Sequence, residues 1–383
     1  MLLIARRIQA CRAAPRGIGI PRSPHFRAVS RSLPMSKGAD GVDSARPDRA
    51  LVLKRLEIPL GLAGAKESSS RALSIPPELT CSGETLSVVH VDAAMGHAAT
   101  FDLQAFQRHL SEGAGDPDGR GAQAWSVLAA TEIPSTQKLL EENAKILPDN
   151  LVVIADTQTE GKGRAGNTWV SPKGCLMCSF LCDLAIEGPK VPLLQYATTL
   201  AVVQALEDLC ADSSGVREAS GESRPQPFAS IKWPNDIYVN GTKVGGVLCQ
   251  TLYRGSGQFQ LICGLGLNLD NEEPTFCVNR AVRASNRAPV TREGLLALVL
   301  PRLLNHFRVI CEESFEPLHG DYYRFWLHSG QRVRVKADAS IKGGAMAGGE
   351  DKDVVITGLS EEGFLLALDE NHDAVELYPD GNR

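Results

Sequence analysis

The sequence predicts a mixed α/β (α+β) domain with one large sheet, followed by a small domain of β-strands. Apolar runs of strand length alternate with amphipathic helical patterns between residues 124 and 314. After residue 330 only short alternating strands remain, at the spacing of a small β-barrel. The 383 residues, 43% apolar and 22% charged, suffice for one large and one small domain. We therefore expect a mixed sheet with helices packed on one side, and a small barrel after it.

Four helices are predicted from apolar residues that recur at three- and four-residue spacing. They cover residues 102–110, 133–147, 192–210 and 291–314. Ser135 or Thr136 is suited to cap the second helix. Its apolar stripe comprises Leu139, Leu140 and Ile146. Pro301 lies inside the fourth helix and is expected to kink it.

Strands are predicted where short apolar runs are bounded by turn-forming residues. They cover residues 124–130, 151–157, 175–184 and 258–270 in the large domain, and 331–337, 353–359, 363–369 and 374–379 in the small one. Residues 237–244 form a hairpin whose Asn240-Gly241 pair suits a type I′ turn. Pro234 cannot donate to a strand ladder, so a turn is expected before this hairpin.

The first 39 residues are strongly basic. They hold seven arginines and Lys37 but no acidic residue, a composition typical of organellar transit peptides. The alternative is a disordered basic tail that touches nucleic acid or membrane. Met35 is a second possible start, which would give a cytosolic form. Residues 40–95 are weakly patterned, and we interpret them as a variable linker region.

Charge and hydropathy exclude two classes of partner. Removing the eight positive charges of residues 1–39 changes the formal net charge from −5 to −13, which does not suit a DNA-binding body. No run of about 18 uninterrupted apolar residues occurs, so no membrane-spanning helix is predicted. We expect no nucleic-acid partner and no membrane partner.

Three cysteines, Cys175, Cys178 and Cys182, are spaced like ligands of zinc or of an iron–sulfur cluster. Their surroundings instead have the pattern of a strand. In a strand Cys178 and Cys182 share a face with Leu176 and Phe180, while Cys175 points to the other side. No histidine lies nearby, so we interpret them as buried free thiols and assign no metal ligands.

Residues 161–174, GKGRAGNTWVSPKG, form a glycine-rich cationic loop directly after the predicted strand 151–157. A Walker phosphate loop is excluded, because the glycine and the Ser or Thr that it requires are missing. A dinucleotide fingerprint is excluded as well, because no helical pattern opens here. The loop can bring backbone N–H groups and the charges of Lys162 and Arg164 to an anion. The alternative is a glycine-rich loop without a ligand.

The stretch KWPND at 232–236 adds a second cluster of polar residues. Lys232, Asn235 and Asp236 lie around a proline-stiffened turn, with Lys243 across the following hairpin. Such lysines, with an amide and a carboxylate that suit Mg²⁺, fit phosphoryl or nucleotidyl transfer. The alternative is a surface hairpin with solvated charges. No Ser-His-Asp or Cys-His pattern is visible among the eight scattered histidines.

Taken in order, these motifs resemble those of one family. The set is STQ at 135–137, Q-x-x-GKGR-x-x-x-x-W-x-SP-x-G at 158–174, KWPNDIYVNGTKVGG at 232–246, GLGLN at 264–268, YYRFWLHSGQRV at 322–333 and ELYPDGN at 376–382. It resembles biotin protein ligase of the eukaryotic holocarboxylase synthetase type, and the motif sequences are most similar to those of plant and algal forms. The resemblance covers residues 100–383.

The resemblance implies a two-step reaction. Biotin and ATP, with Mg²⁺, give biotinyl-5′-AMP and pyrophosphate. A lysine on the biotin carboxyl-carrier domain of acetyl-CoA carboxylase, or of a related biotin-dependent carboxylase, then accepts the biotinyl group. The implied domains are a transit peptide (1–39) leading to plastid or mitochondrion, the linker region (40–95), a biotin/lipoate-ligase-type catalytic domain (96–318) and an SH3-like C-terminal β-barrel (319–383).

The resemblance also implies roles for single residues. Biotin would be bound by Ser135, Thr136, Gln137, Gln158, Lys162, Gly163, Arg164 and Lys243. ATP would be bound by Lys162, Trp169, Lys232, Asn235 and Asn268, and Asn235, Asp236 and Asn268 would help hold ATP with its metal. Lys232 and Arg164 would neutralise the reacting α-phosphate, and Asp236 would assist loss of the proton from the acceptor lysine.

The sequence departs from the family at two places and leaves two alternatives open. The family usually has GRGR where this chain has GKGR, so Lys162 keeps the charge but not the planar fork of arginine. The family also continues past PDGN, whereas this sequence stops at Arg383, which leaves open a truncated C-terminal domain. One alternative is a lipoate-protein ligase of the same fold. The other is a non-catalytic biotin-binding homologue. No DNA-reading helix-turn-helix pattern precedes residue 100.

Overall fold

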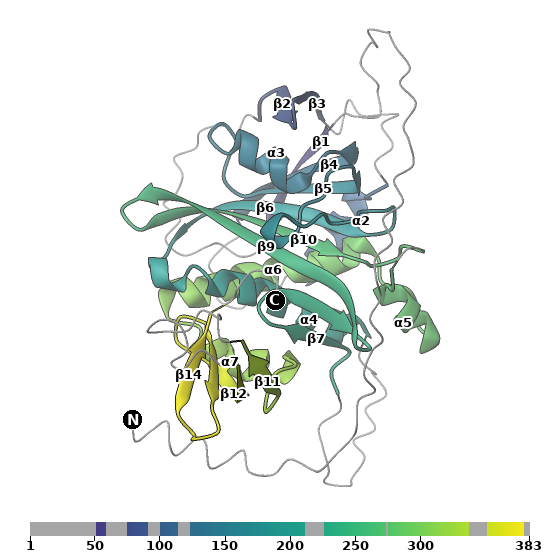
Figure 1. The fold of residues 1–383 in the computed structure, drawn as a ribbon. Helices are drawn as coiled ribbons and strands as arrows, with labels where there is room; N and C mark the ends of the chain where they lie inside the picture. Colours follow the sequence, from purple (N-terminus) through teal and green to yellow (C-terminus); the bar gives the residue numbers. More distant parts are fainter. Residues whose placement is uncertain are drawn as a thin grey trace, which may run out of the picture. The chain divides into compact units, whose positions relative to one another are not determined.

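A computed structural model describes residues 51–58, 75–90, 100–113, 123–210, 226–272, 275–336 and 351–378 of the chain. The predicted transit peptide, the insertion at 211–225 and the PDGN motif lie outside these residues. Within them, ten strands form one large mixed sheet and four form a small antiparallel sheet, which confirms the predicted fold class (Figure 1).

The large sheet has the order β2-β3-β1-β4-β5-β6-β10-β9-β8-β7. Its strands are β1 (Leu51–Ile58), β2 (Glu78–Cys81), β3 (Glu84–His90), β4 (Gln123–Ile133), β5 (Leu151–Gln158), β6 (Leu176–Ala185), β7 (Ala229–Lys232), β8 (Asp236–Val239), β9 (Thr242–Gly255) and β10 (Gln258–Leu267). The pairs β1–β3 and β4–β5 are parallel and the other pairs are antiparallel.

The helices are α2 (Leu103–Gly113), α3 (Thr136–Asn143), α4 (Leu193–Cys210), α5 (Val278–Ala284), α6 (Arg292–Glu312) and α7 (Glu316–Phe325). The small sheet contains β11 (Arg332–Val335), β12 (Lys352–Leu359), β13 (Leu365–Leu368) and β14 (Ala374–Leu377), in that order. Short 3-10 turns cover Arg164–Gly166 and Gly188–Lys190. All four helices expected from the sequence are present, and α5 and α7 are additional.

Part of the stretch interpreted as a linker belongs to the large sheet. β1 pairs with β4, and β3 pairs with β1, so both extend the sheet beyond β4. Leu79 and Leu86 are buried in the same apolar cluster as α3. The sequences of β1 and β3, LVLKRLEI and ETLSVVH, show no clean alternation of apolar and polar residues, so the sequence carried little periodic signal for them.

Helices cover both faces of the large sheet, which corrects the expected one-sided arrangement. β5 shows this directly, because Val152 and Ile154 face the cluster that contains α4 and α6. Leu151 and Val153 point the other way, into the cluster beneath α3. A strand buried on both faces reads as a continuous apolar run, so it does not reveal on which side each helix lies.

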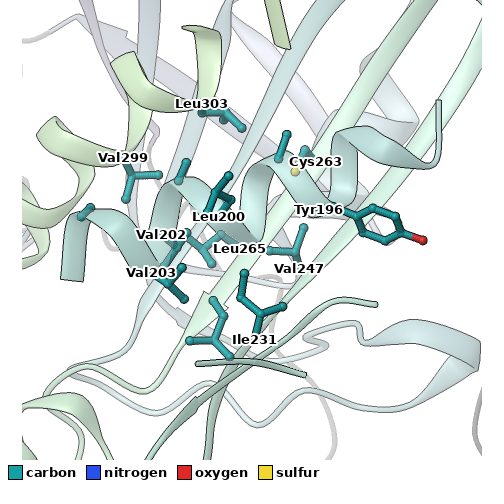
Figure 2. Close-up of a cluster of buried hydrophobic side chains, with 14 of the residues drawn as sticks. Tyr196, Leu200, Val202, Val203, Ile231, Val247, Cys263, Leu265, Val299 and Leu303 are labelled. Carbon is teal, nitrogen blue, oxygen red and sulfur yellow. The ribbon is translucent and has the colours of Figure 1, made fainter. Parts of the chain in front are cut away.

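The main core lies between the sheet, α4 and α6. Leu200 and Val203 of α4 contact strand residues such as Ile231 and Val247, and Val299 of α6 lies on the other side of α4 (Figure 2). By length and composition alone α6 could cross a membrane, yet much of it is buried in this core. α6 continues through Pro301.

Local signals in the sequence account for several boundaries. Ser135 caps α3 by accepting a hydrogen bond from the Lys138 backbone N–H (3.4 Å), as expected of an N-cap. α3 ends at Asn143, and Ile146 is 56% exposed, so Ile146 does not belong to the predicted stripe. Asn240 and Gly241 both have positive φ, in agreement with the predicted type I′ turn between β8 and β9.

α7 was missed because Pro317 and Gly320 weaken its helical pattern. The helix forms because Leu318, Tyr322 and Phe325 are buried in the main core at helical spacing. It leads directly into the small sheet.

The cysteines bear out the interpretation as buried thiols. Cys178 and Cys182 lie in the main core with Leu176 and Phe180, as the strand pattern predicted. Burial raises the pKa of the Cys175 thiol to about 12. Thiols with such pKa values stay protonated at neutral pH, which makes them poor nucleophiles.

A pair of carboxyl groups lies at the far end of β6. Asp183 is partly buried and hydrogen-bonded to Asp149, and burial together with the Asp149 charge raises the pKa of Asp183 to about 6. Asp183 Oδ1 is buried and has no hydrogen-bond partner among the described residues. The folded protein therefore favours a protonated Asp183.

We predict that acidification stabilises the fold through this carboxyl group. Its folded-state pKa of about 6 lies above the ordinary value of 3.8, so the contribution is present below pH 3.8 and is lost as pH rises through 6. Asp183→Asn should flatten the pH dependence of the free energy of unfolding across this window and stabilise the protein at pH 7.5 by roughly 1–2 kcal/mol. Urea unfolding at several pH values measures this, with Asp208→Asn as a surface control. An unchanged slope would contradict the prediction.

Candidate active site

A cavity of about 710 Å³ opens on the face of the sheet that carries α3. Every predicted site residue except Asn268 lines it. These residues are Ser135, Thr136, Gln137, Gln158, Lys162, Gly163, Arg164, Trp169, Lys232, Asn235, Asp236 and Lys243. They come from α3, β5, the glycine-rich loop and the β7–β9 region, so the fold assembles residues up to 108 positions apart in the chain.

The floor of the cavity is bare backbone of β9 and β10. Gly264 and Gly266 are two residues apart in β10 and therefore both lie on its cavity side. Gly246 of β9 is the register partner of Gly266. A Cβ on Gly264 would lie 2.6 Å from Gln137 Oε1, and one on Gly266 would lie 2.7 Å from Trp169 Nε1. Glycine in a strand interior often marks such a close approach, and here it lets side chains and a flat ligand lie against the sheet.

One wall is a chain of neutral polar groups. Gln137 Nε2 donates to Gln250 Oε1 (2.5 Å) and to the Ile262 carbonyl (3.3 Å), which leaves Gln137 Oε1 to accept from Ser179 Oγ (3.2 Å). Since a hydroxyl carries a single proton, Ser179 Oγ then accepts from Thr136 Oγ1 (2.9 Å). The chain fixes the orientation of buried donors and acceptors at the cavity surface.

Gln158 extends this wall toward the loop. Its Oε1 accepts from the Thr136 backbone N–H (2.8 Å) and also lies 3.1 Å from the Thr136 hydroxyl. Its Nε2 donates to Ser171 Oγ (3.0 Å), at the far side of the glycine-rich loop. Gln158 thereby joins the polar wall to the loop that covers the cavity.

The glycine-rich loop folds back on itself as a cover. Gly163 N donates to the Asn167 carbonyl (2.7 Å), and Trp169 N donates to the Gly161 carbonyl (2.9 Å). The Trp169 indole lies against Gly266, and its Nε1 is buried without a hydrogen-bond partner within the described ranges. The indole thus covers the backbone of β10 at Gly266.

Ion pairs hold the start of the loop to α3. Lys162 Nζ lies 2.7 Å from Glu141 Oε2, and Lys138 pairs with Glu160. Lys162 was expected to contact ligands, and it does line the cavity, but its ammonium is paired with Glu141. A ligand anion would therefore compete with Glu141 for this cation.

The opposite end of the cavity is cationic. Arg164 Nη1 donates to Asn235 Oδ1 (2.8 Å), and Lys243 Nζ lies 2.7 Å from Asp236 Oδ1. Lys232 is exposed and has no carboxylate partner among the described residues. Of the described lining residues, Lys162, Arg164, Lys232 and Lys243 are cationic and Asp236 alone is acidic. This imbalance suits a polyanionic ligand.

Asn268 is the predicted residue that the fold keeps away from the cavity. It follows β10, is 4% exposed, and its Oδ1 accepts from the Cys175 thiol (3.5 Å). Its backbone N–H donates to the Val244 carbonyl (2.7 Å). In this structure Asn268 supports the strand ends beneath the site.

Sequence reasoning missed two parts of the cavity. Ser179 lies in an apolar strand, where a serine alone gives no signal. The small sheet supplies an apolar wall through Val333, Ile356, Leu365 and Leu377, and the segment before it supplies His328 and Gln331. The motif YYRFWLHSGQRV could have signalled this contribution, because it places polar residues directly after α7.

Comparisons with known proteins agree with this arrangement. Residues 129–268 match a family model described as the biotin/lipoate A/B protein ligase family. Biotin–protein ligase 2 of Arabidopsis thaliana is 39% identical over 258 aligned positions, which cover 65% of this chain and 71% of that protein. The chloroplastic biotin–protein ligase 1 of the same plant is 39% identical over 254 positions, which cover 65% of this chain and 64% of that protein.

Solved structures show the same fold. A mutant of the biotin protein ligase from Aquifex aeolicus, in complex with biotin, superimposes with a TM-score of 0.51 at 26% sequence identity. The match covers 67% of this chain and 96% of that chain.

We predict that Glu141→Gln loosens the cover, because the amide cannot hold the Lys162 ammonium as an ion pair. Amide hydrogen exchange of residues 161–170 should accelerate about two- to fivefold, the range for a partly exposed pair worth up to about 1 kcal/mol. Mass spectrometry measures the exchange. Glu187→Gln, which removes a 3.7 Å pair with Lys190 outside the loop, is the matched control. Equal exchange in both variants would mean that the pair does not hold the loop.

Proposed function

We infer that this chain, which belongs to the biotin protein ligase family, catalyses the ATP-dependent biotinylation of carboxylase carrier proteins. The observation that carries this function is the cavity itself. A neutral polar wall around Thr136 and Gln137 lies at one end, and Arg164, Lys232 and Lys243 lie with Asp236 at the other. Lys162, which pairs with Glu141 of α3, is the fourth cation of the lining. The polar end suits a neutral ring with amide-like groups, and the cationic end suits a carboxylate next to a triphosphate.

In the proposed first step the biotin carboxylate attacks the α-phosphate of ATP. Both reactants are anionic, so the main task of the protein is to offset their repulsion and orient them. Lys232 is the cation we assign to the α-phosphate, because its ammonium has no carboxylate partner in the described structure. Arg164 supplies a second positive charge and is held in place by Asn235. Pyrophosphate leaves and biotinyl-5′-AMP remains.

The bicyclic ring of biotin is assigned to the polar wall. Its urea group has two N–H donors and a carbonyl acceptor, so it needs partners of both kinds at fixed positions. Thr136, Gln137 and Gln158 offer donors and acceptors, and the hydrogen bonds through Ser179 hold them in place. Ser135 and Gly163 complete this end of the cavity.

A Mg²⁺ ion that enters with ATP fits the residues present. Mg²⁺ in nucleotide sites is usually held by one or two carboxylates together with the substrate phosphates. Asp236 is the one carboxylate among the described lining residues, so it and the phosphates would hold the ion. The ion would supply further neutralisation of phosphate charge.

In the proposed second step a lysine of the carrier domain attacks the biotinyl carbonyl and AMP leaves. Its ammonium, with an ordinary pKa of about 10.4, must first lose a proton. Asp236 is the assigned acceptor for this proton, and its partner Lys243 would then be free to approach the AMP phosphate. The cover formed by the loop and Trp169 limits access of water to the mixed anhydride until the amine arrives.

Three finer assignments are part of this proposal. The basic residues 1–39 support import into a plastid or mitochondrion, and the plastid name of one relative is consistent with the former. Biotin is favoured over lipoate because KWPND and GKGR-x-x-x-x-W follow the biotin protein ligases. The acceptors that we propose are the carrier domains of acetyl-CoA carboxylase and related enzymes.

A transfer assay tests the proposed function. The full chain is incubated with labelled biotin or lipoate, Mg-ATP and a purified carrier domain, and incorporation is measured by mass spectrometry. We expect incorporation of biotin alone. Transfer of lipoate without biotin would establish the lipoate ligase, and biotin binding without pyrophosphate release would establish the non-catalytic homologue.

We predict that Lys232→Ala lowers adenylate formation at least about 100-fold, since it removes a charge that acts mainly on the developing transition state. Biotin binding should stay within twofold, because the ring wall does not involve Lys232. Pyrophosphate release and isothermal titration with biotin measure the two effects. Lys190→Ala, which changes a lysine outside the cavity lining, is the control. Full turnover by Lys232→Ala would refute the assigned role.

We also predict that Gly264→Ala raises the KM for biotin by about tenfold, because the new methyl group would displace the Gln137 amide from its position 2.6 Å away. The KM for ATP should change much less. Steady-state kinetics measure both constants. Gly188→Ala is the matched control, since a Cβ there meets nothing within 4 Å. Equal changes in both constants would argue against a biotin site at Gln137.

A further inference from the structure

His328 lies on the cavity wall, between the catalytic sheet and the small sheet. Both of its ring nitrogens are engaged. Nε2 accepts a hydrogen bond from the Trp233 backbone N–H (3.0 Å), and Nδ1 lies 2.7 Å from Gln331 Oε1. These contacts define the protonation state, because a nitrogen that accepts an N–H carries no proton. The proton is therefore on Nδ1, and the imidazole is neutral.

The segment around His328 extends the ladder of the large sheet. Trp326 forms a parallel bridge with Ile231, and the Leu327 N–H donates to the Ile231 carbonyl (2.9 Å). Directly after β7, the Trp233 N–H also points toward this segment, and its hydrogen bond is accepted by the imidazole of His328. Trp233 stands directly between Lys232 and the Pro234-Asn235 turn, so the bond anchors that turn from one side.

The same segment is tied to the small sheet. Gly330 N donates to the Ile356 carbonyl (3.0 Å), and Ile356 N donates to the Gln331 carbonyl (2.9 Å). The Trp233 indole Nε1 adds contacts to Tyr196 Oη (3.1 Å) and the Gly363 carbonyl (3.2 Å). The turn that presents Lys232 is thus held jointly by the small sheet and by His328.

We propose that His328 is a positioning residue for adenylate formation: its neutral imidazole holds the Trp233 backbone and thereby sets the place of Lys232 and Asn235 at the ATP end of the cavity. This inference rests on the proposed function. It assigns a role to a side chain for which the motifs implied none, although His328 lies within the motif YYRFWLHSGQRV. Because His328 contacts the turn and not the polar wall, its effect is confined to the use of ATP.

Protonation would break this arrangement. A proton on Nε2 would face the Trp233 N–H, donor against donor, and a second positive charge would appear beside Lys232. Burial, in the first place, and the nearby Lys232 charge lower the pKa of His328, while Gln331 raises it. Lys232 is the charged group that faces the ring among the described residues, and its other neighbours are the neutral Gln331 and the Trp326 ring. Adenylate formation should therefore fail on the acid side of neutrality.

Two variants of the full chain test the proposal by pyrophosphate release. His328→Leu cannot accept a hydrogen bond, and we expect its KM for ATP to rise by about tenfold with the KM for biotin within twofold, the size expected for a buried donor left without a partner. In His328→Gln the amide oxygen can replace Nε2 as acceptor without titrating. This variant should keep near-normal kinetics at pH 7.5.

The pH profile separates positioning from a general structural role. Wild-type kcat/KM for ATP should fall as pH drops through the lowered His328 pKa. The titration of ATP affects wild type and His328→Gln equally, so it cancels when the wild-type kcat/KM is divided by that of the variant. This ratio should therefore fall at the same pH. If His328→Leu does not fold, this ratio decides alone. A flat ratio, or equal rises of both KM values in His328→Leu, overturns the proposal. Absence of adenylate formation in the wild type would instead refute the proposed function.

Discussion

The placement of four cations against one carboxylate is the constraint on which the rest of the site depends. Like charges repel, so each cation needs a fixed partner until a polyanion arrives. Arg164 has Asn235, Lys162 has Glu141 and Lys243 has Asp236. Lys232 has no carboxylate or amide partner among the described residues; its ammonium lies 5.9 Å from the centroid of the Tyr238 ring. The turn that carries it is held by backbone contacts from several elements. The fold thus holds four positive charges at the cavity surface in the absence of a ligand.

The neutral wall meets a different requirement. Buried polar groups without partners are costly, so the wall must be satisfied both with and without a ligand. Its hydrogen-bond chain through Ser179 and Gln250 meets that requirement, and the bare backbone at Gly264 leaves room for the chain to lie close to the sheet. The charged side chains and the neutral polar side chains thus lie in different parts of one cavity. This separation can orient biotin, which has a neutral ring system and an anionic carboxylate.

Much of this arrangement could be predicted from residues near one another in sequence. The loop 161–174, the KWPND turn and the Asn240-Gly241 hairpin are local patterns with local geometry. Together with Gln158 and the STQ motif they led to the twelve predicted residues that line the cavity. Contributions that arise from long-range packing could not be predicted. Ser179 is part of the polar wall of the cavity because β6 pairs with β10. The helix α7 forms because its apolar face is buried. Asn268 does not line the cavity in this structure, because its motif says nothing about which side of a strand end faces the cavity.

The junction at Gly363 has a consequence for the synthesis of the protein. The Gly363 carbonyl accepts from Tyr196 Oη (2.8 Å) and from the Trp233 indole, and β13 and β14 also line the cavity. These strands emerge from the ribosome more than 100 residues after the loop and the KWPND turn. A nascent chain that still lacks them has this side of the cavity open. The cavity can therefore close only after residues far apart in the chain have been synthesised and β13 and β14 have docked.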